Sequence, residues 1–245
     1  MPDLPRLIHL DANGAEGSGL TRLELDAADF QSEVPIQHLH VFFEDADLGL
    51  VVGVWDTTTM QEAFGPYPGD EFVWVLEGHF AMIDGDGDAV HAGPGDSVAF
   101  RNAAPMSWKQ DGYLKKFFVT HLDPDRRTPN VVPGDGAVIV MDPDAPLADV
   151  SENGGPVERE HLAFTNDTGN MRVGLWECDT ADFGMSPFPV HEFVQVLAGE
   201  ATIAEADGTT HHVKAGDCFF IPEGTVCQWQ IPKYVKKYYA QIDAK

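Results

Sequence analysis

The chain has 245 residues, 43% of them hydrophobic, with 24 Gly and 17 Pro, a composition typical of a globular protein rich in turns. Its formal net charge of −25 argues against nucleic acid as a partner, and no apolar run reaches the roughly 20 residues of a membrane span or resembles a signal peptide. Three cysteines are too few for a disulfide framework, which favours a reducing cytoplasm.

Short apolar segments separated by turn residues predict an all-β protein. In chain order, a first strand at residues 7–10 opens the first half, and further strands are expected at residues 48–55, 72–76, 97–100 and 116–120. A strand at residues 137–141 opens the second half, and others are expected at residues 173–176, 193–197, 218–221 and 237–241. Asp84-Gly85 and Asp207-Gly208 are hairpin signals between them. This regular spacing predicts a small barrel or jelly roll in each half.

The two halves align with each other at an offset of 121 positions without a gap. Gly53-Val54-Trp55 aligns with Gly174-Leu175-Trp176, and Glu71-Phe72-Val73 aligns with Glu192-Phe193-Val194. Internal similarity of this kind indicates a duplicated domain rather than a solenoid. We therefore predict an N-terminal domain over residues 1–124, a Pro-, Gly- and Asp-containing linker over residues 125–136, and a C-terminal domain over residues 137–245.

Two series of motif residues carry a resemblance to a known family. Glu71 and Gly78 bracket an apolar strand, as do Glu192 and Gly199, and each half continues with Gly-Asp, a tryptophan and Lys-Lys. This pattern resembles the two motifs of the cupin superfamily, most closely the cupin-3 subgroup, which is related to the cupins of ureidoglycine aminohydrolase. The resemblance covers residues 35–122 and 156–243. It implies two tandem cupin domains, each a jelly-roll or double-stranded β-helix barrel, that pair within the chain, with a homodimer as a further option.

The histidines with which cupins bind metal are missing from both halves. The resemblance places a His-x-His pair just before each motif glutamate, where this chain has residues 64–67 and 185–188. A further histidine position holds Met106 in the first half and Cys227 in the second. Since one carboxylate is too few for a tight site, we predict no metal or other cofactor. A non-standard divalent metal site in the C-terminal barrel is the alternative.

A glutamate that points into a barrel without a metal needs another cation, because an unpaired buried carboxylate is costly. We expect Lys116 to pair with Glu71 and Lys237 to pair with Glu192. If the strand faces are reversed, the preceding lysine of each pair takes this place. In the remaining arrangement both lysines lie in solvent.

Aromatic residues complete the predicted pockets. Trp108 and Trp229 share a strand face with the missing histidine positions, so they either line a cavity or fill a closed core. Trp55 and Trp176 are expected to be packing residues. The other candidates for ligand binding are Tyr67, Phe188, Tyr239 and Cys227, the last of which also fits a buried, unreactive thiol.

Three functions remain open at this point. One is an enzyme that acts on a small nitrogenous or carboxylated metabolite, ureide-like by the family resemblance, through metal-free hydrolase, isomerase or lyase chemistry. Glu192 is then the catalytic acid or base, and Lys237 steers charge. The second is a non-catalytic binder or sensor with the same pocket, and the third is a structural bicupin with filled barrels. His191, Cys227 and the Pro222-x-Gly224 segment distinguish the second half and favour it as the active one.

Overall fold

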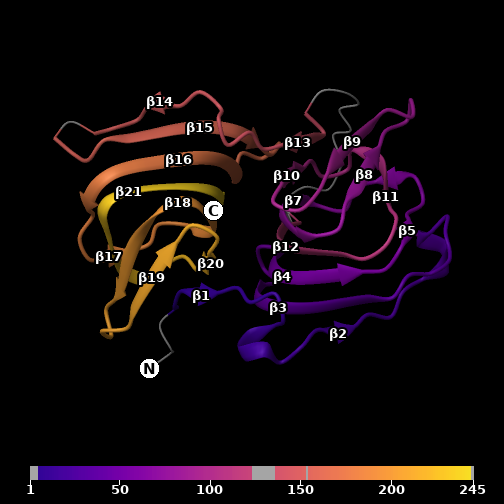
Figure 1. The fold of residues 1–245 in the computed structure, drawn as a ribbon, viewed down its shortest axis with the longest axis horizontal. Helices are drawn as coiled ribbons and strands as arrows, with labels where there is room; N and C mark the ends of the chain where they lie inside the picture. Colours follow the sequence, from indigo (N-terminus) through magenta and orange to yellow (C-terminus); the bar gives the residue numbers. More distant parts are fainter. Residues whose placement is uncertain (1–4, 123–135, 153, 244–245) are drawn as a thin grey trace. The chain divides into compact units, whose positions relative to one another are not determined.

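The computed structural model describes residues 5–122, 136–152 and 154–243, and nearly all of its regular structure is β. Figure 1 follows the chain through two sets of strands. Of the described residues, those up to His9, Asp142–Thr165 and those from Gly169 onward form a C-terminal unit. Leu10–Met141 and Asn166–Thr168 form an N-terminal unit. No helix in the described ranges is long and apolar enough to cross a membrane.

The N-terminal unit contains two antiparallel sheets (Figure 1). The larger has the strand order β13-β10-β7-β12-β4-β3-β2. Its members are β2 (Thr21–Arg22), β3 (Gln37–Asp45), β4 (Leu50–Thr57), β7 (Asp70–Glu77), β10 (Ser97–Phe100), β12 (Leu114–His121) and β13 (Val138–Val140). The smaller has the order β5-β11-β8-β9, with β6 paired to β11. Its members are β5 (Met60–Gln61), β6 (Gly65–Pro66), β8 (Phe80–Ile83), β9 (Ala89–Ala92) and β11 (Pro105–Gln110). Short 3₁₀ helices lie at Ala15–Gly17 and Ala27–Asp29.

Alternation of side chains along β7 and β12 decides which residues of the N-terminal unit face its core. Val73 and Val75 lie in the core cluster, so Glu71, two residues earlier on β7, shares their face. Leu114 and Phe118 lie in the same cluster, so Lys116 between them also faces inward. The sequence period of two thus brings a carboxylate and an ammonium to the same interior.

The C-terminal unit contains one sheet of nine strands, with the order β1-β20-β18-β21-β16-β15-β14, with β17 paired to β21 and β19 paired to β18. Figure 1 shows its long, curved strands β16 (Met171–Asp182), β18 (His191–Glu205) and β21 (Val226–Ile242). The pairing of β18 with β21 shifts register at residues 196–198 and 199–202, where β18 is irregular or bulged. The remaining strands are β1 (Ile8–His9), β14 (Ala148–Asp149), β15 (Glu158–Thr165), β17 (Ser186–Pro187), β19 (Thr210–Lys214) and β20 (Cys218–Ile221).

Two short strands belong to a different unit from the half of the chain that the sequence predicts them to open. The segment at residues 7–10, predicted to open the first half, forms β1 and pairs with β20 of the C-terminal unit, with Ile8 opposite Phe220. The segment at residues 137–141, predicted to open the second half, forms β13 and pairs with β10 of the N-terminal unit, with Val98 opposite Val140. Both are edge strands, and an edge offers the same backbone groups to any strand that reaches it.

The other predicted strands are present, and several are longer than predicted. The strands at residues 97–100 and 218–221 match β10 and β20 residue for residue, and they are related by the same offset of 121 positions. Of the predicted linker, residues 125–135 lie outside the described residues, so the boundaries at 124 and 137 stay a prediction.

Candidate functional site

The C-terminal unit contains a partly open cavity of about 330 Å³. Aromatic side chains and several polar groups line it, namely Trp176, Phe183, Phe188, Trp229, Cys227, Glu158, Glu160, Lys237, Tyr239 and Gln241. The sequence proposed five of these residues as site residues: Phe188, Cys227, Trp229, Tyr239 and Lys237. Concave sites with apolar walls and a few polar groups are the usual form of a small-molecule site.

The expected ion pair is present beneath this cavity. Lys237 Nζ on β21 donates to Glu192 Oε1 on β18, and Gln241 Nε2 donates to Glu192 Oε2 at 2.7 Å. Glu192 is 1% exposed and is not one of the lining residues, whereas Lys237 and Gln241 are. The structure therefore places Glu192 as a buried carboxylate behind Lys237, whose side chain lines the cavity.

Two indoles flank the Lys237 ammonium. Its Nζ lies 5.0 Å from the ring centroid of Trp176 and 4.9 Å from that of Trp229, which is within range of a cation–π interaction. Trp176 Nε1 donates to Glu158 Oε2 at 3.2 Å. Trp176 packs against the core, as predicted, and its ring also lines the cavity and contacts the buried cation.

Sequence reasoning missed the two carboxylates Glu158 and Glu160, which lie two residues apart on β15. Tyr239 Oη donates to Glu160 Oε1 at 2.6 Å, and burial together with this carboxylate raises the pKa of Tyr239. Burial also raises the pKa of Glu158, although the hydrogen bond from Trp176 opposes the shift. The signal was the Glu-x-Glu alternation, which puts both carboxylates on one face of a strand.

A glycine makes room for the tyrosine hydroxyl. A Cβ on Gly174 would lie 2.5 Å from Tyr239 Oη and 2.6 Å from the carbonyl oxygen of His161. Both contacts are shorter than real Cβ atoms show. The Gly-x-Trp motif of β16 therefore serves two purposes, because Gly174 admits Tyr239 and Trp176 forms the neighbouring wall.

The N-terminal unit has a cavity of about 320 Å³ with the corresponding ion pair. Lys116 Nζ lies 3.0 Å from Glu71 Oε1, and Tyr67 Oη donates to Glu71 Oε2. The ammonium lies 5.2 Å from the ring centroid of Trp55 and 4.9 Å from that of Trp108. Burial, with the neighbouring Glu71 carboxylate, raises the pKa of Tyr67. All five residues line the cavity, so Trp55, like Trp176, does more than pack.

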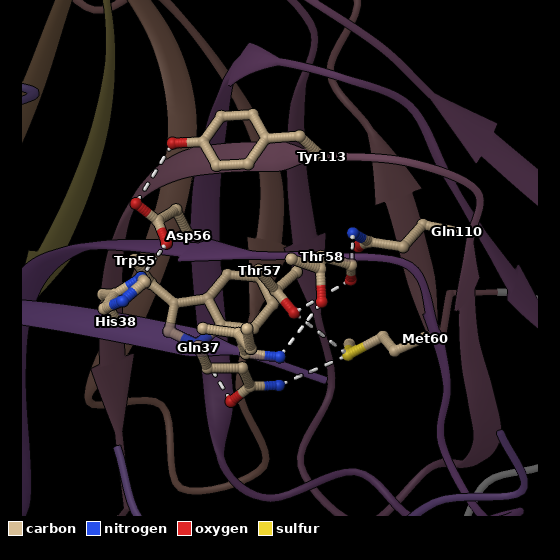
Figure 2. Close-up of polar contacts among 10 residues, drawn as sticks. Gln37, His38, Trp55, Asp56, Thr57, Thr58, Met60, Gln110 and Tyr113 are labelled. Carbon is tan, nitrogen blue, oxygen red and sulfur yellow. Dashed lines mark hydrogen bonds and ion pairs between the residues drawn. The ribbon is translucent and has the colours of Figure 1, made fainter. Parts of the chain in front are cut away.

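Hydrogen bonds from the sheet hold the wall of this cavity (Figure 2). Trp55 Nε1 donates to Gln37 Oε1 at 3.3 Å, and Gln37 Nε2 donates to Met60 Sδ at 3.3 Å. Trp108 Nε1 donates to Gln110 Oε1 at 2.8 Å. In the C-terminal unit, Ile231 stands at the position of Gln110 and cannot accept a hydrogen bond through its side chain. Trp229 Nε1, which corresponds to Trp108 Nε1, accordingly has no hydrogen-bond partner among the residues that the structure describes.

The opposite face of the same strands carries a polar cluster, which Figure 2 also shows. His38 Nδ1 lies 2.7 Å from Asp56 Oδ1, and Tyr113 Oη donates to Asp56 Oδ2 at 3.1 Å. At the offset of 121 positions, Arg159 Nη1 donates to Glu177 Oε1 at 2.8 Å, and Tyr234 Oη donates to Glu177 Oε2 at 2.7 Å. Both units thus have a basic residue, a carboxylate and a tyrosine arranged in this way, and none of these side chains lines either of the two cavities.

Cys227 lines the C-terminal cavity as a protonated thiol. Burial raises its pKa to about 11, and the carboxylates of Glu205 and Glu192 add to the shift. Nucleophilic cysteines have lowered pKa values and positive neighbours. The environment of Cys227 therefore fits the interpretation as a buried thiol, and Cys178 and Cys218 are also buried and free.

The side chains present do not fit a divalent cation. Within the described ranges, no group of three or more His, Cys, Asp or Glu side chains is arranged to hold a metal. Both oxygens of Glu192 accept hydrogen bonds, from Lys237 and Gln241, and both oxygens of Glu71 accept them from Lys116 and Tyr67. Each motif glutamate thus faces a fixed ammonium that would repel a second cation.

Comparisons with known proteins agree with this architecture. Residues 165–239 match the Cupin_3 family model, described as an EutQ-like cupin domain. A search among curated proteins found no match. The chain resembles the crystal structure of a DUF861-family protein of unknown function from Pseudomonas syringae pv. tomato, with 21% identity and a TM-score of 0.77 over 97% of this chain and 99% of that one.

Two further structures have the same fold at lower identity. A putative dioxygenase from Nostoc punctiforme has 10% identity and a TM-score of 0.64, covering 99% of this chain and 84% of that one. A Cupin 2 conserved barrel domain protein from Leptotrichia buccalis has 11% identity and a TM-score of 0.56, covering 87% and 91%. At these identities the likeness concerns the fold and not the activity.

Proposed function

From the match of residues 165–239 to a cupin family model, we propose that this chain is a cupin whose C-terminal cavity binds a small polar metabolite with nitrogen donors and an oxygen acceptor. Ureido and guanidino carboxylic acids have this chemistry. The observation that carries the proposal is that one cavity holds the carboxylates of Glu158 and Glu160 and the ammonium of Lys237. Two of the three charges are negative, so a ligand nitrogen with several N–H groups suits the cavity.

Hydrogen-bonding capacity supports the same ligand class. A lysine ammonium has three donors, and Lys237 uses one of them for Glu192, which leaves donors for a carboxylate or carbonyl oxygen. Glu158 and Glu160 each accept one bond, from Trp176 and Tyr239, and a carboxylate can accept several. Both ends of such a ligand therefore find partners in the cavity.

Binding is favoured over acid–base catalysis by Glu192. Both of its oxygens accept hydrogen bonds from protein groups, and it lies behind the lining residues Lys237 and Gln241. A general base must come within hydrogen-bond reach of the proton that it removes. A non-catalytic binder or sensor is accordingly the function that this arrangement supports best, and an enzyme that uses Glu192 requires those side chains to move.

Calorimetric titration with three matched probes tests the proposal. Guanidinoacetate carries a cationic nitrogen group and a carboxylate, ureidoacetate carries a neutral nitrogen group and a carboxylate, and butyrate carries the carboxylate alone. We expect affinity to fall in that order and Glu160→Gln to weaken guanidinoacetate by about tenfold, the usual effect of losing one charged hydrogen bond.

The control is Lys116→Met, which alters the other cavity and is expected to leave guanidinoacetate binding unchanged. Butyrate binding as tightly as guanidinoacetate would contradict the proposal. So would a Glu160→Gln protein that binds all three probes as the unaltered chain does.

A further inference from the structure

The two cavities share an ion pair but differ in their other charged groups. Gln37 in the N-terminal unit stands at the position of Glu158, and both accept a hydrogen bond from the corresponding tryptophan, Trp55 or Trp176. The two bonds are 3.3 and 3.2 Å long. The hydrogen bond from the tryptophan is therefore the same in both cavities, but the acceptor is a carboxylate in the C-terminal cavity and a neutral amide in the N-terminal one. The two cavities thus differ at this position in charge and not in shape.

A second position changes in the same direction. The C-terminal pair Glu160 and Tyr239 is joined by a hydrogen bond, whereas Leu39 and Phe118 occupy the corresponding places in the N-terminal cavity. Neither of these side chains carries a charged or hydrogen-bonding group. The N-terminal cavity therefore lacks both carboxylates that make the C-terminal cavity acidic, and it has an amide and two apolar side chains in their place.

The N-terminal cavity has a carboxyl of its own at a different place. Glu62, which follows β5, lines the cavity, and Phe183 stands at its position in the C-terminal unit. Its backbone is held by bonds from Glu62 N to the carbonyl oxygen of Trp108 at 2.9 Å and from Ser107 Oγ to the carbonyl oxygen of Glu62 at 2.7 Å. Its carboxyl has no hydrogen-bond partner among the described residues.

The surroundings of Glu62 favour the protonated acid. Burial raises its pKa to about 7, Lys116 opposes the shift, and the carboxylates of Glu71 and Asp29 add to it. The Lys116 charge is already balanced by Glu71, to which Tyr67 also donates. Below neutral pH, Glu62 is then an O–H donor beside the apolar and aromatic side chains of the cavity.

We propose that the N-terminal cavity is a second binding site, for an uncharged ring compound with a carbonyl-type acceptor, to which the carboxylic acid of Glu62 donates. Trp55, Trp108 and Phe118 supply the faces for the ring, and the ammonium of Lys116 offers a second donor for the same acceptor. The inference concerns a different unit from the proposed function, so neither depends on the other.

The test uses benzamide, benzylammonium and benzoate, which share a ring and differ in charge. Binding is followed by NMR through the indole N–H signals, assigned by single Trp→Phe substitutions. Trp55 and Trp108 report on the N-terminal cavity, and Trp176 and Trp229 report on the C-terminal one. At pH 6 we expect benzamide to shift the signals of Trp55 and Trp108 more strongly than either charged probe.

The pH dependence identifies the donor. Ionisation of Glu62 removes the O–H, so benzamide affinity at the N-terminal signals should fall about tenfold as the pH rises through about 7. Glu62→Gln keeps a neutral donor of similar shape and should bind benzamide with no such fall. Glu62→Phe, which copies the residue of the C-terminal cavity, should abolish binding.

The proposal is overturned if benzylammonium or benzoate is preferred at Trp55 and Trp108, or if benzamide shifts neither signal up to its solubility limit. It is also overturned if Glu62→Gln retains the pH dependence of the unaltered chain. An unchanged indole spectrum of the free variant shows that it is folded. The signals of Trp176 and Trp229 report separately on the C-terminal cavity, which is the site of the proposed function.

Discussion

Replacing Lys237 with methionine tests how much the buried ion pair stabilises the C-terminal unit. The side chains of Lys237 and Glu192 are 9% and 2% exposed, so the Glu192 carboxylate has little contact with water that could replace the ammonium. The substitution leaves Glu192 with one hydrogen bond, from Gln241. Removing one partner of a buried pair typically costs about 3–5 kcal/mol in the free energy of unfolding. The methionine retains most of the packing against Trp176 and Trp229.

Urea unfolding, followed by circular dichroism and indole fluorescence, measures this loss. Lys233→Met on the exposed part of the same strand is the matched control, and it should change the free energy of unfolding by less than about 0.5 kcal/mol. Adding Glu192→Gln to Lys237→Met removes the charge left unpaired. The double variant should therefore lose clearly less than the two single variants together.

Two results would refute this reasoning. One is a Lys237→Met protein as stable as Lys233→Met, which would mean that Glu192 reaches water or another cation at little cost. The other is strict additivity in the double variant, which would mean that the two groups do not interact. In either case the replacement of a metal by lysine would not account for the buried carboxylate.

Three other predictions follow from the same structure. Gly199→Ala places a Cβ 2.0 Å from the carbonyl oxygen of Tyr234, so it should lower the free energy of unfolding in urea by more than about 3 kcal/mol. Gly216 also has a positive φ but has nothing within 4 Å, so Gly216→Ala should cost only about 1 kcal/mol, and equal losses would contradict this prediction. Since burial raises its pKa to about 11, Cys227 is a thiol at pH 8. Iodoacetamide labelling, measured by mass spectrometry, should be at least about a hundredfold slower in the folded chain than in urea, and its rate should rise as the pH approaches 11. Fast labelling of the folded chain at pH 8 would be inconsistent with a buried thiol. After incubation with Mn, Ni, Zn or Fe, elemental analysis should find less than one metal per chain, and a stoichiometric metal that is lost in Glu192→Gln would overturn our interpretation of the glutamate.

The ion pairs could be predicted because they depend on strand periodicity and motif spacing. Alternation fixes the face of Glu71 relative to Val73, and the same rule places Lys116 beside Phe118. The fold class followed from the same regularities. By contrast, Glu62 follows a strand of two residues, and nothing in its local sequence indicates that it lines a cavity.

Other features depend on contacts between distant segments. Glu158 and Glu160 alternate as any half-exposed strand does, and their place in the cavity depends on the pairing of β15 with β16. The partners of β1 and β13 could not be predicted, because strands of two and three residues carry no pattern that distinguishes one sheet edge from another. The sequence could place Glu192 on the inward face of its strand. It could not show that Lys237 and Gln241 lie between Glu192 and the cavity, because that depends on the side-chain positions.

The pairing of β1 with β20 has a consequence for synthesis of the chain on the ribosome. The bond between His9 and His211 joins residues 202 positions apart, so the earliest described strand waits for almost the last one before its sheet is complete. Closing so long a loop is entropically costly and slows folding. The N-terminal unit in turn completes its larger sheet only when β13 has emerged. A chain released from the ribosome before β13 is made would carry an unpaired strand, β1, and an unpaired sheet edge at β10, which is the kind of species that chaperones bind and that aggregates.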